Sequence, residues 1–377
     1  MRNHGTRIMR KNNQISTPGW VISLALMIVV SVSLLSGCAT YTPEFRDTRH
    51  QIQPNSVTEM REVTLGGVQQ NIIIRGTNRN NPILLIIPGG GLSILPVMSK
   101  SNSDLEQHFV VVHWDIRGTG KSYFNKPDAR DMTFDQMIRD TEELTELLLG
   151  EFQQEKLFIM GWSLGSAITM GAVKKRPDLF YANIAVCQVV NFLENEKVGY
   201  DYILAEAKKR NNEEALTELT RLGPPPYEKD NLMHAFQIKG KWLVEFNGVI
   251  HDKDSLEKTP LGEQYFSGEM YTHSKEYSFW DLFKIMWGMK FFLTSCYDEM
   301  IHADLSKQVT DVEVPLYFFL GRHDYNAPAT LAEHYFQAIR APEKKMIWFE
   351  HSAHYPFLEE PEKFNNEVVA IGQQTGQ

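Results

Sequence analysis

The chain has 377 residues, of which 42% are hydrophobic and 11% aromatic, and its formal net charge is −9. This composition excludes a disordered chain and is sufficient for a sizeable buried core. The negative charge disfavours nucleic acids and anionic membrane surfaces as partners, so no nucleic-acid binding is expected.

The first 37 residues differ in composition from the rest. They hold four basic residues and no acid, and then the apolar run WVISLALMIVVSVSLL, which is shorter than the roughly 20 residues that span a bilayer comfortably. Leu35-Ser36-Gly37-Cys38 follows, and it resembles the lipobox of bacterial lipoproteins. The resemblance implies that residues 1–37 are a signal peptide and that Cys38 is lipidated. An uncleaved membrane anchor is the alternative.

A lipid on Cys38 predicts a protein anchored in the bacterial cell envelope and facing outside the cytoplasm. Ala39 is compatible with sorting to the outer membrane of a two-membrane bacterium. Residues 38–59 lack hydrophobic periodicity and are predicted to be a tether that lifts the domain off the membrane. The remaining cysteines, Cys187 and Cys296, are predicted to be buried free thiols.

From residue 60 onward, short apolar runs alternate with helical patterns. The expected strands are the hairpin EVTLGGVQQNIIIRG and the runs PILLIIP, FVVVHWD, KLFIMGW, NIAVCQVV, PLYFFLG and KMIWFEH. Such runs, separated by helices, predict an α/β fold with a mostly parallel central sheet flanked by helices. Between two of the strands, Thr133 and Gln136 predict a capping-box helix start, and Gly150 predicts the end of that helix.

The alternation stops between residues 191 and 312, where helical patterns predominate. We interpret this segment as a helical cap insertion over one end of the sheet. It divides the core into residues 60–190 and 313–377.

The segment GWSLGS places Ser163 between two glycines, directly after an expected strand. This pattern is typical of a nucleophile elbow, a strained turn that lifts a serine hydroxyl above the sheet edge. A serine needs a histidine to take its proton and an acid to orient that histidine, here in the order serine, acid, histidine. Asp324 follows PLYFFLG and His354 follows KMIWFEH, so these three residues are the predicted catalytic triad.

Other interpretations of these residues are weaker. Asp324 taken alone would be a loop-capping residue, and His351 lies nearer its strand than His354 does. Glu194 follows an earlier strand and is the alternative acid, although a solvated cap residue is the preferred interpretation. His351 and His354 lack a third clustered ligand and an HExxH pattern, so no metal site is expected. Serine hydrolase chemistry implies no organic cofactor either.

The developing oxyanion needs two N–H donors. Leu164 directly follows the serine, and the glycines at 89–91 follow the strand PILLIIP, so the backbone N–H groups of Gly90 and Leu164 are the predicted oxyanion hole. A simple tight turn is the alternative for the glycines.

Taken together, the elbow, the GGG loop, WDIRGTGKS and SAHYPFLEEP resemble α/β-hydrolases of the proline iminopeptidase group, over residues 60 to 370. The resemblance implies an α/β-hydrolase fold, a triad of Ser163, Asp324 and His354, and an oxyanion position at Gly90. Two features depart from the group: the stretch Pro88-Gly89-Gly90-Gly91 lacks the usual leading histidine and inner proline, and Trp162 precedes the serine rather than following it.

The sequence therefore predicts a serine hydrolase that forms an acyl-enzyme. An aminopeptidase acting on short peptides is the first hypothesis, and a carboxylesterase or lipase acting on small esters is the alternative. A lipoprotein that only binds a ligand is the rival from another class. The expected partners are a small-molecule or short-peptide substrate and the membrane, through the lipid on Cys38. In the peptidases of the group, cap glutamates hold the substrate amine, and five are available here: Glu194, Glu196, Glu206, Glu245 and Glu269.

Overall fold

The computed structural model describes residues 40–125 and 127–375. Within these residues, eight strands form one sheet with the spatial order β1-β2-β4-β3-β5-β6-β7-β8. The strands are β1 Val57–Leu65, β2 Val68–Gly76, β3 Ile83–Ile87, β4 Val110–Asp115, β5 Leu157–Trp162, β6 Phe180–Val186, β7 Leu316–Gly321 and β8 Lys344–Phe349.

The sheet is mostly parallel. Only the pairs β1–β2 and β2–β4 are antiparallel, and the other neighbours run parallel. Every residue of β3, β4, β5 and β7 is buried, as expected for strands covered on both faces. The predicted α/β-hydrolase fold is confirmed.

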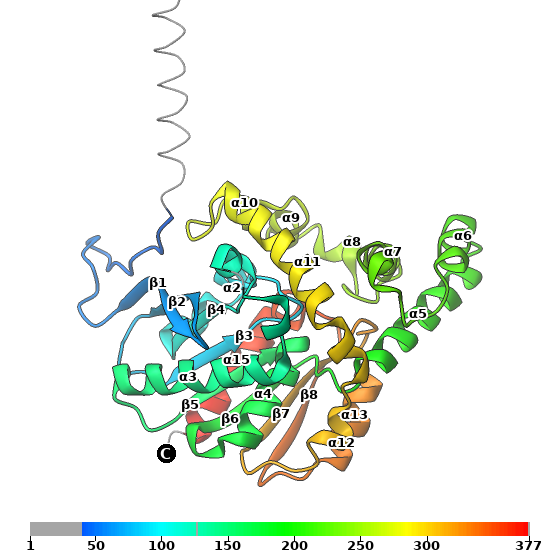
Figure 1. Cartoon of the computed structure of the whole chain (residues 1–377). Coiled ribbons are helices and arrows are strands. Elements are labelled where there is room, and N and C mark those ends of the chain that lie inside the picture. Colours follow the sequence, from blue (N-terminus) through cyan, green and yellow to red (C-terminus); the bar gives the residue numbers. More distant parts are fainter. Residues whose placement is uncertain (1–39, 126, 376–377) are drawn as a thin grey trace, which may run out of the picture. The chain divides into compact units, whose positions relative to one another are not determined.

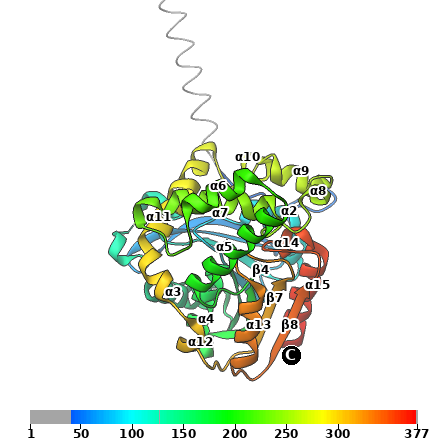
Figure 2. The ribbon, with the colours of Figure 1, turned by 90° about the vertical axis from the view of Figure 1, so that its right-hand side faces the viewer.

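Helices cover both faces of the sheet. The helices α3 Phe134–Phe152 and α4 Leu164–Lys175 lie on one face and α15 Pro361–Thr375 on the other (Figures 1 and 2). The remaining helices of the core are α2 Leu95–Ser101, α12 Leu305–Gln308, α13 Ala329–Ala338 and α14 Pro356–Glu359, and short 3-10 helices cover Ser103–Gln107, Gly120–Asn125, Ala129–Asp131 and Pro177–Leu179.

The predicted start of α3 after Thr133 is confirmed. The Thr133 side chain accepts a hydrogen bond from the Gln136 N–H at 3.1 Å. Only half of the predicted capping box forms, because the Gln136 side chain bonds Asp140 and Arg139.

The predicted end of the helix is wrong. The helix continues past Gly150 to Phe152. It ends there because the next residue, Gln153, adopts the left-handed conformation (φ 55°) and donates its N–H to the Leu149 carbonyl.

The insertion between β6 and β7 is helical. It contains α5 Phe192–Lys209, α6 Glu213–Leu222, α7 Leu232–Glu245, α8 Lys253–Leu256, α9 Pro260–Phe266, α10 Glu269–Thr272 and α11 Phe279–His302, with a 3-10 helix at Lys229–Asn231. These helices gather at one end of the sheet (Figure 2). Among the described helices, none combines the length and the apolar character that a bilayer crossing requires.

The segment expected to be a free tether packs on the domain over its described residues, 40–56. Arg75 donates hydrogen bonds to the Thr42 hydroxyl at 2.5 Å and to the Pro43 carbonyl at 2.8 Å. Its guanidinium also lies 4.9 Å from the ring centre of Phe45. Extended chain without periodicity is held here by side-chain and main-chain contacts with residues far along the chain, so the domain begins well before residue 60. The predicted signal peptide and Cys38 lie outside the described residues.

Candidate active site

A cavity of about 200 Å³ lies between the sheet and the cap. Its floor comes from loops at the carboxyl ends of five parallel strands, which supply Gly90, Ser163, Val189, Asn326 and His354. Its roof comes from cap helices α5, α7 and α11. In open α/β sheets, ligands bind outside the carboxyl ends of the strands, so this cavity is the candidate active site.

Ser163 lies on a strained turn between β5 and α4. Its backbone angles are φ 54° and ψ −127°, a conformation that residues with a side chain rarely adopt. The turn also needs a very close approach of α4 to β3: a Cβ on Gly165 would lie 2.3 Å from the carbonyl oxygen of Ile87. The local sequence thus has the geometry of a nucleophile elbow, with the serine at the cavity.

Asp324 and His354 form a buried pair. The Nδ1–H of His354 donates to Asp324 Oδ2 at 2.7 Å, and both residues are 3% exposed. The other carboxylate oxygen of Asp324 accepts the N–H groups of Asn326 and Ala327, each at 2.8 Å. These bonds fix the carboxylate, which in turn holds the hydrogen of the imidazole on Nδ1 and leaves Nε2 as an acceptor.

The acceptor nitrogen of His354 faces an amide that the sequence did not single out. Asn326 Nδ2 lies 3.1 Å from His354 Nε2, whereas no hydrogen bond joins Ser163 Oγ to that nitrogen within the described chain. Ser163 and His354 nevertheless line the same cavity. Catalytic hydrogen bonds are often long or poorly aligned without substrate, so the missing bond does not contradict the triad. The structure brings the three predicted triad residues together at one site.

Trp162 holds the histidine loop in place. Its indole N–H donates to the His354 carbonyl at 2.9 Å, and its ring centre lies 5.2 Å from that of His354. Glu359 braces the same loop, because its carboxylate accepts the N–H groups of Ala353 at 2.9 Å and of His251 at 2.6 Å. The tryptophan before the serine, a departure from the group, therefore has a positioning role.

The two predicted oxyanion residues also line this cavity. Leu164 is the first residue of α4, so its N–H lies at a helix N-terminus, where backbone donors lack intrahelical partners. Gly90 has φ 59°, a left-handed conformation that favours glycine. This backbone places the loop after β3 beside the serine, where an N–H can approach a substrate oxygen.

The alternative residues lie elsewhere. His351 is exposed and lines a separate hollow with His251 and Asp252. Glu194 is exposed and pairs with Lys197 at 2.8 Å.

One cap glutamate reaches the cavity. Glu196 of α5 and Lys239 of α7 both line it, and they form an ion pair with side-chain exposures of 5% and 4%. Among the described residues, Glu196 Oε2 has no hydrogen-bond partner. The pair therefore offers a desolvated carboxylate oxygen to a ligand in the cavity, with a cation beside it. Glu206 pairs with neighbours on its own helix, and Glu245 and Glu269 are exposed.

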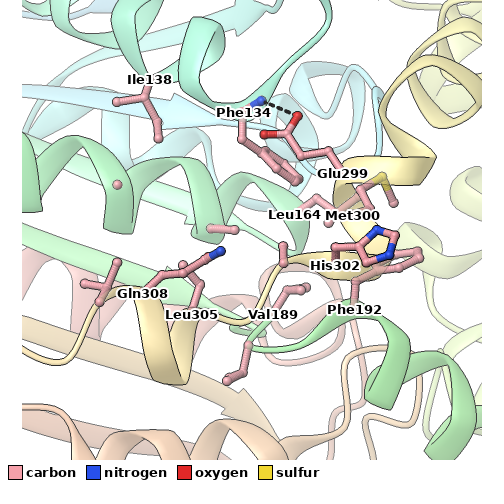
Figure 3. A pocket seen from close by; sticks show the side chains of 15 residues that line it. Phe134, Ile138, Leu164, Val189, Phe192, Glu299, Met300, His302, Leu305 and Gln308 are labelled. Atoms are coloured by element: carbon pink, nitrogen blue, oxygen red, sulfur yellow. Dashed lines mark hydrogen bonds between the residues drawn. The ribbon is translucent and has the colours of Figure 1, made fainter.

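A second, mostly apolar cavity of about 320 Å³ adjoins the first (Figure 3). Leu164, Val189 and Phe192 line both cavities and so form a shared wall. Glu299 is the carboxylate in its lining; it accepts the Phe134 N–H at 3.0 Å, and burial raises its pKa. The space suits an apolar group rather than a charged one.

Three potential metal ligands lie close to one another at the aspartate–histidine pair. Ligand atoms of Cys187, Asp324 and His354 lie within 4.8 Å of one another. Burial raises the pKa of the Cys187 thiol well above its usual value, which disfavours the thiolate that a metal requires. The bond between His354 and Asp324 already uses two of the three ligands. The donor set fits a hydrogen-bonded dyad better than a metal centre.

Comparisons with known proteins agree with this geometry. A family model described as serine aminopeptidase, S33 matches residues 83–200. The chain is 34% identical over 321 residues to the probable aminopeptidase YbaC of Bacillus subtilis, covering 83% of this chain and 96% of that protein. It is 24% identical over 291 residues to a proline iminopeptidase of Heyndrickxia coagulans, covering 75% and 87%. The fold is similar to that of a proline iminopeptidase of Mycobacterium smegmatis, with a TM-score of 0.61, 15% identity and coverage of 84% and 98%.

Proposed function

Because the chain belongs to the serine aminopeptidase S33 family of α/β-hydrolases, we propose that it releases N-terminal residues from short peptides through an acyl-enzyme on Ser163. One observation carries this proposal: a buried aspartate–histidine pair and a strained serine share a cavity with a buried, unpartnered carboxylate oxygen. The first three groups suit acyl transfer, and the last suits a substrate ammonium.

The reaction follows from these positions. Ser163 Oγ attacks the carbonyl carbon while its proton passes to His354 Nε2, and Asp324 stabilises the imidazolium that forms. The N–H groups of Leu164 and Gly90 stabilise the oxyanion; losing one such donor typically lowers turnover about 100-fold to 1000-fold. The imidazolium protonates the leaving amine, and water then cleaves the ester to release the acid and restore the serine.

The Asn326 amide has to release His354 Nε2 before that nitrogen accepts the serine proton. A substrate that draws the serine and histidine together would compete with this amide for the nitrogen. Asn326 therefore holds the imidazole in its reactive tautomer in the free enzyme, because its N–H group requires a lone pair on Nε2.

Glu196 is the proposed anchor of the substrate amine. Its free Oε2 accepts an N–H of the ammonium, while Lys239 keeps the carboxylate from being a lone buried charge. An acetylated N-terminus removes both the charge and two donors, so it leaves Glu196 Oε2 unpaired. Acetylated peptides should accordingly be poor substrates.

We also propose that the enzyme lies in the bacterial cell envelope, anchored by a lipid on Cys38. The lipobox-like sequence at residues 35–38 supports this location. Metabolic labelling with a palmitate analogue tests it: wild type is labelled and Cys38→Ala is not.

The decisive experiment measures kcat/KM on prolyl and alanyl arylamides with free and acetylated N-termini, beside a short-chain aryl ester. We expect a strong preference for free amines and no activity in Ser163→Ala. A fluorophosphonate probe should label the wild type and not that variant. Ester turnover without amide turnover would assign a carboxylesterase instead, and a folded wild type that takes no label would indicate a binding protein.

The amine anchor needs a variant that does not leave a buried lysine unpaired. The double substitution Glu196→Gln with Lys239→Met keeps the cavity neutral, and Glu245→Gln on the exposed face of α7 is the matched control. We expect the double variant alone to lower the preference for free over acetylated substrates by at least about tenfold. An unchanged preference would remove Glu196 from the site.

A further inference from the structure

An aromatic surface follows the first half of α11. We call it the α11 aromatic face, and it consists of Phe124, Phe279, Trp280, Phe283, Met286 and Trp287. Five of these side chains are between 46% and 67% exposed, and Phe283 lies half-buried among them. Phe283 links the rings: its centre lies 5.2 Å from Phe279, 5.7 Å from Trp280 and 5.8 Å from Trp287.

This surface is not explained by the packing of α11 within the domain. The inward side of the helix buries Ile285, Gly288 and Phe292, so the core contact is made by other positions. Contiguous exposed aromatic groups are rare on soluble proteins and mark interaction surfaces. The α11 aromatic face is therefore a candidate interaction surface.

The described chain begins beside this face. The Tyr41 N–H donates to the Lys275 carbonyl at 3.0 Å, and the Thr42 hydroxyl donates to Glu276 at 3.1 Å, both just before α11 (Figure 1). Lys121 bridges Thr40 at 3.1 Å and Asp281, in the first turn of α11, at 2.9 Å. Residues 40–42 are thus fixed at the end of α11 that carries the aromatic groups.

This position limits how far the proposed lipid-bearing residue, Cys38, can lie from the start of α11. Cys38 precedes Thr40 by two residues, which span at most about 7 Å. Since residues 40–42 are bonded to the domain, a lipid on Cys38 would hold this end of α11 at the bilayer surface. Membrane proteins place tryptophan and other aromatic groups at this depth, where an apolar ring meets hydrated headgroups.

We propose that the α11 aromatic face docks in the interfacial layer of the lipid bilayer and, with the anchor, fixes the domain on the membrane. Charge is secondary: the chain is acidic overall, and the first half of α11 carries Lys284 and Lys290 against Asp281, which is buried and paired. The binding is therefore chiefly apolar and persists in 1 M salt.

Docking would also orient the active site, because α11 contributes Met289 and Leu293 to the catalytic cavity. The proposal goes beyond the hydrolase activity, and it draws on the lipid at Cys38 only for the location of the bilayer.

The test uses the full chain, purified from the envelope in mild detergent and reconstituted in phosphatidylcholine vesicles. An environment-sensitive fluorophore is placed at Met286→Cys, and at Glu313→Cys as the control. Glu313 is exposed and precedes β7, at the end of the sheet opposite the cap. The described native cysteines, Cys187 and Cys296, are buried and should not react.

We expect a blue shift and quenching by spin-labelled lipid at position 286 only, unchanged in 1 M NaCl. Replacing Phe279, Trp280 and Trp287 by serine should reduce the quenching to the level of the control, with arylamide turnover in detergent retained. A label at 286 that stays solvent-exposed on vesicles would overturn the proposal. So would shielding that occurs without lipid and depends on protein concentration, which would indicate a second copy of the chain. Both outcomes are independent of whether the site hydrolyses peptides.

Discussion

Trp162→Phe tests whether the tryptophan before the serine positions the catalytic histidine. The substitution removes the indole N–H that bonds the His354 carbonyl at 2.9 Å and leaves a smaller ring against a buried loop. The lost hydrogen bond costs about 0.5–1.5 kcal/mol, and the space left by the smaller ring adds a similar amount. We therefore expect a loss of about 2 kcal/mol in the free energy of unfolding.

The effect on catalysis should be larger than stability alone explains. A displacement of about 1 Å at a catalytic group can lower turnover about 100-fold, so a looser His354 loop should lower kcat by at least about tenfold with little change in KM. The assay combines chemical denaturation with arylamide kinetics at a temperature where every variant is folded.

Trp348→Phe is the matched control. Trp348 is half-buried on β8 beside the Arg322 guanidinium, 3.6 Å from its ring centre, and within the described chain its indole N–H makes no hydrogen bond. We expect a loss below about 1 kcal/mol and an unchanged kcat. If Trp162→Phe matched this control in both stability and kcat, the positioning role of Trp162 would be wrong.

Three further predictions concern the elbow, the shared wall and a buried histidine. Gly165→Ala should lose at least about 3 kcal/mol of stability in chemical denaturation, because the added Cβ would clash with backbone atoms. Gly150→Ala, where the added Cβ has open space, should gain about 0.5–1 kcal/mol. Equal effects of the two substitutions would contradict the elbow packing. Phe192→Ala should join the two cavities and raise kcat/KM for leucyl relative to alanyl arylamide by about tenfold, and an unchanged ratio would show that the wall does not limit substrate size. Burial, with the charge of Arg75, lowers the pKa of His113 from the usual 6.5 to about 3. Between these two pH values the unfolded chain binds a proton at His113 that the folded chain does not bind. The free energy of unfolding should therefore fall as the pH drops from 6.5 towards 3. His113→Gln should reduce this dependence of stability on pH, and His108→Gln, at an exposed site, should leave it unchanged. Chemical denaturation at several pH values measures it. The same pH dependence in both variants would exclude His113 as the cause.

Much of the fold was predictable because its signals are local. Buried parallel strands appear as short apolar runs, and the hairpin β1–β2 turns at the glycine pair at 66–67 that the sequence shows. The predictions failed where local signals compete or are weak. Gly150 has no special conformation because the next turn is still helical, and residues 40–56 pack through contacts with side chains far along the chain.

The candidate site divides in the same way. Ser163, Asp324 and His354 could be named because each lies within three residues of the end of a predicted strand and the order is set by the topology. The geometry around them could not. Three contacts at the site join residues that are distant in the sequence, so no local pattern predicts them. They are Asn326 with His354 Nε2, the Trp162 indole with the His354 carbonyl 192 residues away, and Glu196 with Lys239.

The sequence by itself determined the strands, the helical insertion and which residues follow each strand, because periodicity and chain order are properties of neighbouring residues. It also determined the resemblance to a family of serine hydrolases. Only the tertiary structure decided which of five cap glutamates enters the cavity, and that a lysine accompanies it there. It also decided that the aromatic groups of α11 remain exposed beside the start of the described chain. The physical reason is that burial depends on which helix faces pack together. Because α11 has apolar residues on more than one face, its sequence does not show which face is buried.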